Sequence, residues 1–128
     1  MFEVSKEFSF EASHALPHLP PGHKCRNIHG HSYRIKVVCR GKLDERGFVV
    51  DYAEISEAMR PILSQMDHAY LAGNNESIPD GRVCKIDAPC TSAEYLAKWI
   101  YDTLRESLPE LHQVFVYETA KTSVAYPC

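Results

Sequence analysis

Residues 2–13, FEVSKEFSFEAS, alternate between apolar and polar side chains, and this stretch decides how the rest of the chain can fold. Its even-numbered positions are apolar except for Lys6, and its odd-numbered positions are all Glu or Ser. Side chains of a β-strand point alternately to its two faces, so the pattern predicts a strand with one buried face.

A second strand is predicted over residues 31–40, HSYRIKVVCR, where alternate positions from Tyr33 to Cys39 are apolar. A short strand is expected at Phe48–Val50, and two more at 113–119 and 122–126. Residues 113–117 are apolar on both faces. We therefore expect a partner subunit, or closure of the sheet into a barrel, to cover the outer face of that strand.

Two helices are predicted between these strands. Asp51 and Glu54 have the spacing of a capping box, and apolar residues then recur at helical intervals to Met66. Pro61 lies within that pattern, so a kink or an early end is expected there. Thr91 and Glu94 form a second capping box, followed by a helix with the expected buried stripe Leu96, Trp99, Ile100, Thr103 and Leu104.

The order of elements indicates one α+β domain over residues 1–128, with an antiparallel sheet and both helices on one face. The intervening segment 72–89, rich in Gly, Asn, Asp and Pro, is expected to be a long connection. A 45% apolar composition suffices for a core of this size.

The charge pattern argues against nucleic acid or a membrane surface as a partner. The net charge is −3, and no run of Lys or Arg stands out. No segment approaches the roughly 18 apolar residues of a membrane span, and residues 1–14 contain no apolar signal region. We expect a cytoplasmic protein with a small-molecule substrate, whose five cysteines are free thiols.

The strongest chemical signal is His29-Gly30-His31, taken together with His14. His29 and His31 share the inward parity of Tyr33, while His14 continues the inward series of the first strand. Three neutral imidazoles around an open position are typical of a catalytic zinc ion. The alternative is a turn with two solvated histidines. His18, His23 and His112 are interpreted as surface residues.

Three further sites carry polar groups that could act beside a metal. Cys25 lies between Lys24 and Arg26, where nearby positive charge favours a thiolate that could be a base, a nucleophile or a fourth ligand. In Asp67-His68 a carboxylate can orient an imidazole for proton transfer, although His68 could merely complement a helix dipole.

Glu118 ends an otherwise apolar strand with a charge. A carboxylate in this position could accept two hydrogen bonds from the planar N–H edge of a guanidine-like heterocycle. Exposure to solvent at the strand end is the alternative.

Five motifs in order along the chain resemble the 6-pyruvoyl-tetrahydropterin synthase superfamily. They are FEASHALPH (10–18), GHKC-x3-HGHSY (22–33), LSQMDH (63–68), TSAEYLA (91–97) and YET (117–119). The resemblance implies a tunnelling (T-) fold, with a four-stranded antiparallel sheet and two helices. It also implies a homo-oligomer built from barrel-forming trimers, often a hexamer.

Site roles follow from the resemblance position by position. His14, His29 and His31 match the zinc ligands, Cys25 matches the proton acceptor, and Asp67 and His68 match the relay. Glu118 matches the residue that anchors the pterin ring and is often assigned to the relay as well. Thr91 and Ser92 match pterin contacts, although a capping role explains them equally well.

Only three residues separate Cys25 from His29, which resembles the 6-carboxytetrahydropterin synthase branch of the family. The resemblance therefore implies conversion of 7,8-dihydroneopterin triphosphate to 6-carboxy-5,6,7,8-tetrahydropterin, with release of acetaldehyde and triphosphate, in queuosine biosynthesis. The alternatives are a synthase that stops at the 6-pyruvoyl product and a non-catalytic zinc- or pterin-binding module. Cys90, where the family tends to have proline, and segment 72–89 have no assigned role.

Overall fold

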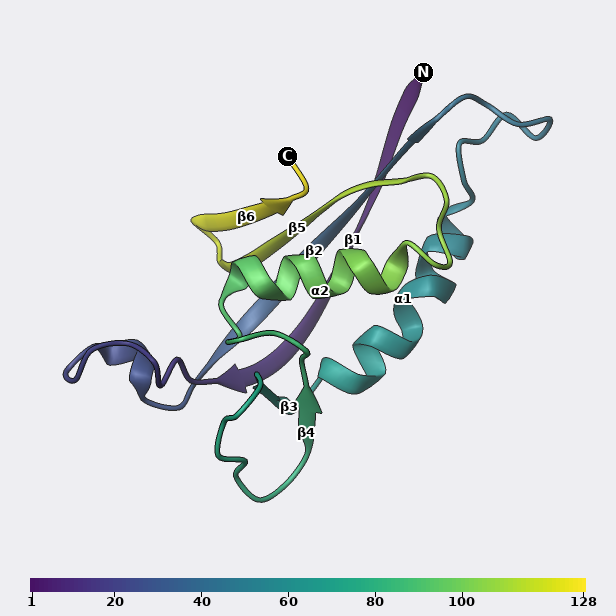
Figure 1. The fold of residues 1–128 in the computed structure, drawn as a ribbon. Coiled ribbons are helices and arrows are strands. Elements are labelled where there is room, and N and C mark those ends of the chain that lie inside the picture. Colours follow the sequence, from purple (N-terminus) through teal and green to yellow (C-terminus); the bar gives the residue numbers. More distant parts are fainter.

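A computed structural model describes all 128 residues as one sheet covered by two helices (Figure 1). The strands are β1 (Phe2–His14), β2 (His29–Gly41), β3 (Ala69–Ala72), β4 (Val83–Lys85), β5 (Leu111–Thr119) and β6 (Thr122–Tyr126). The helices are α1 (Tyr52–Met66) and α2 (Ala93–Leu104), with a 3-10 turn at Lys24–Arg26. Neither helix is long and apolar enough to span a membrane.

The long hairpin of β1 and β2 forms the centre of the sheet. It pairs antiparallel from Phe2↔Gly41 to His14↔His29, and the strand order is β4-β3-β1-β2-β5-β6. The inward residues Tyr33, Ile35 and Val37 are completely buried beneath the helices, as their parity predicts. The α+β class and the helices on one face are thus confirmed (Figure 1).

The expected four-stranded sheet is wrong in detail, because the sheet has six strands. Strands β3 and β4 come from the region around the segment expected to be a long connection, and each pairs parallel with its neighbour. Residues 48–50 do not form the predicted short strand, and Val49 and Val50 lie in a bend. Val49 and Val50 are nevertheless buried, so the apolar pattern there reflects packing alone.

The helix ends show which side chains cap the backbone. The Asp51 carboxylate accepts from the Ala53 N–H at 2.9 Å, as expected, but Glu54 pairs with Arg46 and does not complete a capping box. Helix α1 runs through Pro61 to Met66, so the early end considered from the sequence does not occur.

Helix α2 is capped by Ser92, whose Oγ accepts from the Tyr95 N–H at 3.4 Å, and the predicted cap at Thr91 is wrong. Thr103, predicted to be buried, is exposed. Its hydroxyl donates to the Trp99 carbonyl at 2.8 Å, so the polar side chain remains on the solvent side of the helix.

The sheet face without helices is polar. Arg40 and Glu3 form an ion pair across β1 and β2 at 2.8 Å. The outer side chains of β5, Phe115 and Tyr117, are half-buried beneath Lys36 and Arg34, whose cations lie 4.2 and 4.1 Å from the ring centroids. Within the chain, neighbouring cations therefore cover part of the outer apolar surface of β5.

Candidate active site

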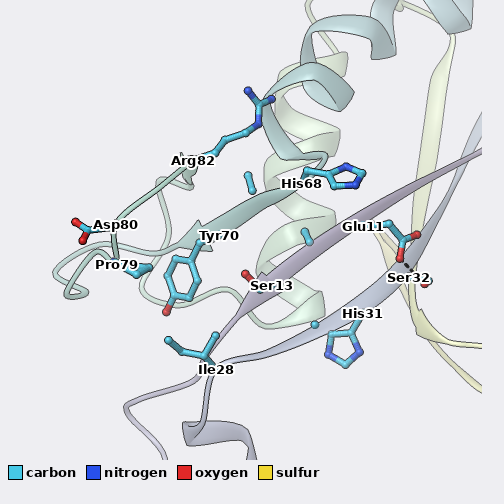
Figure 2. Close-up of a pocket in the computed structure, with 13 residues that line it drawn as sticks. Glu11, Ser13, Ile28, His31, Ser32, His68, Tyr70, Pro79, Asp80 and Arg82 are labelled. Atoms are coloured by element: carbon cyan, nitrogen blue, oxygen red, sulfur yellow. Dashed lines mark hydrogen bonds between the residues drawn. The ribbon is translucent and has the colours of Figure 1, made fainter.

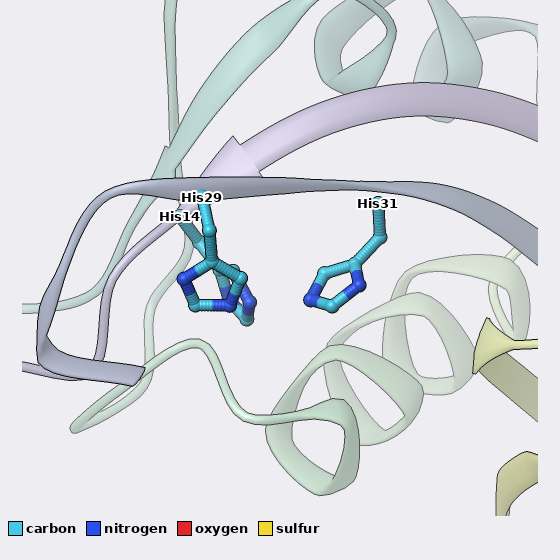
Figure 3. Close-up of side chains that lie close together, drawn as sticks. All are labelled: His14, His29 and His31. Atoms are coloured by element: carbon cyan, nitrogen blue, oxygen red, sulfur yellow. The ribbon is translucent and has the colours of Figure 1, made fainter. Parts of the chain in front are cut away.

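Three histidines meet where the β1–β2 hairpin ends. His14 and His29 are the last pair of the hairpin, and His31 lies opposite Ala12. The three potential ligand atoms lie within 4.8 Å of one another, and the rings are on the same side of the hairpin (Figure 3). The expectation that strand parity brings these imidazoles together is confirmed.

Backbone carbonyls select the tautomer of two of these rings. His14 Nδ1 lies 2.9 Å from the Thr91 carbonyl oxygen, and His29 Nδ1 lies 2.7 Å from the Asn27 carbonyl oxygen. A carbonyl can only accept, so in the neutral rings each Nδ1 carries the proton. Both Nε2 atoms are then unprotonated and have lone pairs available to a metal.

The Nε2 atoms of His14 and His31 are buried without a hydrogen-bond partner. Burial is the main cause that lowers the pKa of His14 to about 4, and it also lowers the pKa of His31, so both rings are neutral near pH 7. Yet Glu118 Oε2 lies 3.5 Å from His14 Nε2 and 3.6 Å from His31 Nε2. The unprotonated Nε2 of His14 faces this carboxylate, and its lone pair repels the carboxylate unless a cation lies between them. The donor set therefore fits a zinc ion.

Glu118 reaches this position because it shares the inward parity of Val114 and Val116 on β5. Its side chain is 27% exposed, so it borders the cluster without being enclosed. The same cluster contains a residue that the sequence analysis did not single out. Tyr33 is completely buried, its hydroxyl has no partner, and burial followed by the charge of Glu118 raises its pKa. Its signal was the inward parity that it shares with His31.

Thr91 and Ser92 have separate tasks within the chain. Thr91 is fully buried, and His14 Nδ1 contacts both its carbonyl and its hydroxyl, the latter at 3.2 Å. Ser92 caps α2. Thr91 is therefore a partner that orients a histidine, the usual arrangement around a metal-ligating imidazole.

Cys25 lies in the 3-10 turn of the loop that joins β1 to β2. Its N–H donates to His23 Nδ1 at 3.1 Å, and its carbonyl accepts from the Leu16 N–H at 2.8 Å. The residue is half-buried, and its thiol is not part of the group of ligand atoms formed by the three histidines. His23, expected to be a plain surface residue, helps to fix this turn.

Asp67 and His68 follow α1, and the chain reverses sharply there. His68 has φ +57°, and its N–H donates to the Glu11 carbonyl at 2.6 Å. His68 Nδ1 lies 3.0 Å from Asp67 Oδ1, which also accepts from the Glu11 N–H at 3.0 Å. That backbone N–H, followed by His68, holds the pKa of Asp67 below its usual range. The predicted carboxylate–imidazole pair is therefore present.

This pair shares a pocket with only one of the three histidines of its own chain. His68 is 75% exposed and lines a pocket of about 610 Å³ together with Glu11, Ser13 and Ser32 (Figure 2). Those three positions alternate with the buried residues of β1 and β2, so they belong to the sheet face without helices. His31 is the one histidine of the three-histidine cluster that also borders this pocket.

Comparisons with known proteins agree on one family. The family model described as 6-pyruvoyl tetrahydropterin synthase matches residues 3–127. The chain is 37% identical over 133 residues to the 6-carboxy-5,6,7,8-tetrahydropterin synthase of Synechocystis sp., covering 98% of this chain and 93% of that protein. It is 30% identical over 143 residues to the Haemophilus influenzae protein of the same name, covering 98% and 99%.

A solved structure has the same fold. The 6-pyruvoyl tetrahydropterin synthase of Caenorhabditis elegans superimposes with a TM-score of 0.81 at 26% identity, covering 99% of this chain and 95% of that one.

Proposed function

Because the chain belongs to the 6-pyruvoyl tetrahydropterin synthase family, we propose that it is a zinc-dependent carbon–carbon lyase. It converts 7,8-dihydroneopterin triphosphate to 6-carboxy-5,6,7,8-tetrahydropterin, releasing acetaldehyde and triphosphate, as a step of queuosine biosynthesis in the cytoplasm. The observation that carries the proposal is the pair of buried, partnerless Nε2 atoms facing Glu118. The names of the full-length relatives support the choice of reaction.

His14, His29 and His31 hold the zinc ion. When bound, zinc supplies a Lewis acid that polarises substrate oxygens and acidifies the adjacent C–H groups. Glu118 accepts the N–H edge of the pterin ring, so that the side chain of the substrate lies beside the metal site. Cys25 takes or relays one proton from that side chain, and His68, oriented by Asp67, handles the other. Thr91 and Ser92 lie at positions where the family contacts the pterin.

The protein works as a homo-oligomer in which one copy supplies the histidines and another supplies Asp67 and His68. The support is geometric, because within one chain the relay pair lies on the sheet face opposite to the helices. A second copy docked against that face brings its histidines to the pocket beside His68. Barrel-forming trimers, alone or paired as hexamers, are the assembly expected of the family.

A synthase that stops at the 6-pyruvoyl product is the second candidate, because the Caenorhabditis elegans structure carries that name. The three-residue spacing between Cys25 and His29 favours the carboxy product. A non-catalytic zinc- or pterin-binding module is the third candidate, but it needs neither a thiol nor a carboxylate–imidazole pair.

Product analysis tests the proposal. Purified zinc-loaded protein is incubated with 7,8-dihydroneopterin triphosphate, and the products are identified by mass spectrometry. We expect 6-carboxytetrahydropterin and acetaldehyde. A 6-pyruvoyl product would replace the first candidate with the second, and absence of turnover with zinc bound would favour the binding module. Full turnover by a Cys25→Ala variant would remove Cys25 from the mechanism.

A further inference from the structure

The segment between β3 and β4 has no role in the proposed reaction, yet it forms one wall of the pocket beside His68. Pro79, Asp80 and Arg82 line that wall (Figure 2). The Arg82 carbonyl accepts a hydrogen bond from the Tyr70 N–H at 2.9 Å. Tyr70 follows His68 by two residues, so this bond holds the backbone of Arg82 close to the relay pair. The segment is thus tied to the strand that follows the relay pair.

Arg82 makes a single side-chain hydrogen bond, and it goes to the relay pair. Its Nε–H donates to the Asp67 carbonyl at 3.1 Å. Asp80 lines the same pocket. The guanidinium is therefore bonded through Nε to the backbone of Asp67, and, after the Glu11 N–H and His68, its charge also contributes to the lowered pKa of the Asp67 carboxyl.

The carbonyl that Arg82 contacts belongs to the peptide bond between Asp67 and His68, next to a residue with an unfavourable backbone conformation. His68 has a Cβ atom and φ +57°, a left-handed conformation that such residues rarely adopt. Conformations of this kind persist only where the surroundings fix them, and they cluster at functional sites. Glu11 fixes the segment from the β1 side, through the His68 N–H and the Asp67 carboxylate. Arg82 is the contact from the opposite side.

We propose that Arg82 is a positioning residue for the Asp67–His68 pair, holding the Asp67 carbonyl so that the His68 imidazole stays turned into the pocket. The inference rests on the proposed function, because it gives His68 the proton-transfer role stated there. It assigns a task to a segment that the sequence analysis left without one. It also predicts that Arg82 acts only through His68.

A double-mutant cycle tests this dependence. Arg82→Ala is expected to lower kcat about tenfold with little change in KM, because misplacing a catalytic group slows the chemical step. Arg82→Lys, which keeps a donor, is expected to recover part of that loss. In a His68→Ala background, Arg82→Ala should cost nothing further. Lys85→Ala, on β4 directly after that segment, is the matched control and should leave kcat unchanged.

An equal loss in both backgrounds, or a rise in KM alone, would overturn the proposal, because Arg82 would then act on the substrate itself. Zinc content and thermal unfolding of each variant identify any that fail to fold. NMR of the His68 ring gives a readout without turnover, and Arg82→Ala should shift its resonances while Lys85→Ala should not. If His68→Ala leaves turnover intact, the proposed relay fails, and unchanged His68 resonances in Arg82→Ala would separately refute the positioning role.

Discussion

The histidine cluster and the Asp67–His68 pair are built in opposite ways. His14 is 1% exposed, and a contact with the buried Thr91 orients its ring. His68 is 75% exposed and lies where the chain reverses sharply. The first group lies on the inward side of the hairpin with one ring buried and two half-buried, and the second lies beside an open pocket on the other face.

The difference indicates which side chains of the site a single chain can hold in fixed positions. A metal site needs several donors at fixed positions, and backbone carbonyls hold two of the rings in the tautomer that a cation requires. A proton relay needs access to substrate, so it remains exposed. Predictions that damage one region and spare the other test this division.

The largest effect is expected from removing a metal ligand. His29→Ala should abolish turnover and lower zinc affinity by more than about 100-fold. Losing only a hydrogen-bond partner of a ligand costs up to about 100-fold, and losing the ligand itself should cost more. His29 is only half-buried, so the variant should still fold. Zinc content measured by mass spectrometry of the native protein checks this. His18→Ala, an exposed histidine of the β1–β2 loop, is the control, and equal zinc content in the two variants would contradict the assignment.

Metal removal should expose an acid sensitivity that belongs to the buried cluster alone. The pKa of His14 is about 4 in the fold and about 6.5 when unfolded, so the unfolded chain binds the proton more tightly between those values. The free energy of unfolding of chelator-treated protein therefore has its highest value above pH 6.5 and falls as the pH drops toward 4. His14→Gln should reduce this slope and His68→Gln should retain it, as measured by urea unfolding at several pH values. Identical slopes in both variants would contradict the account.

The smallest effect concerns the orientation of one ligand. Thr91→Val removes the hydroxyl 3.2 Å from His14 Nδ1 but leaves the carbonyl at 2.9 Å. Zinc affinity should fall by less than about tenfold, because the stronger partner remains. Thr103→Val, on the exposed face of α2, should have no effect in the same zinc titration. A loss as large as that of His29→Ala would mean that the hydroxyl, not the carbonyl, fixes the ring.

The long strands and the histidine cluster could be predicted from the sequence because both depend on one rule, the alternation of side chains along a strand. That rule placed His14, His29 and His31 on the inward side with Tyr33, and the structure brings them together. It also gave Glu118 the inward parity of Val114 and Val116, and the structure adds that this carboxylate lies next to two of the rings.

The rest depends on contacts between distant segments. Strands β3 and β4 have four and three residues, too few for a periodic signal, and they exist because they pair beside β1. Thr91 and Ser92 are equally good cap residues in sequence, and the contact of Thr91 with His14 decides between them. The side of the sheet on which His68 lies depends on the left-handed backbone conformation of that single residue, and no local sequence pattern predicts it.

The central claim is that the two regions cooperate across copies of the chain, and subunit complementation tests it most directly. His29→Ala, expected to be inactive, and His68→Ala, expected to keep only residual turnover, carry different tags and are co-expressed so that mixed oligomers can be isolated. If one copy supplies the histidines and another supplies the relay, a random equal mixture should recover about a quarter of wild-type turnover. Mixed oligomers that stay inactive, or a wild-type monomer with full turnover, would contradict the claim.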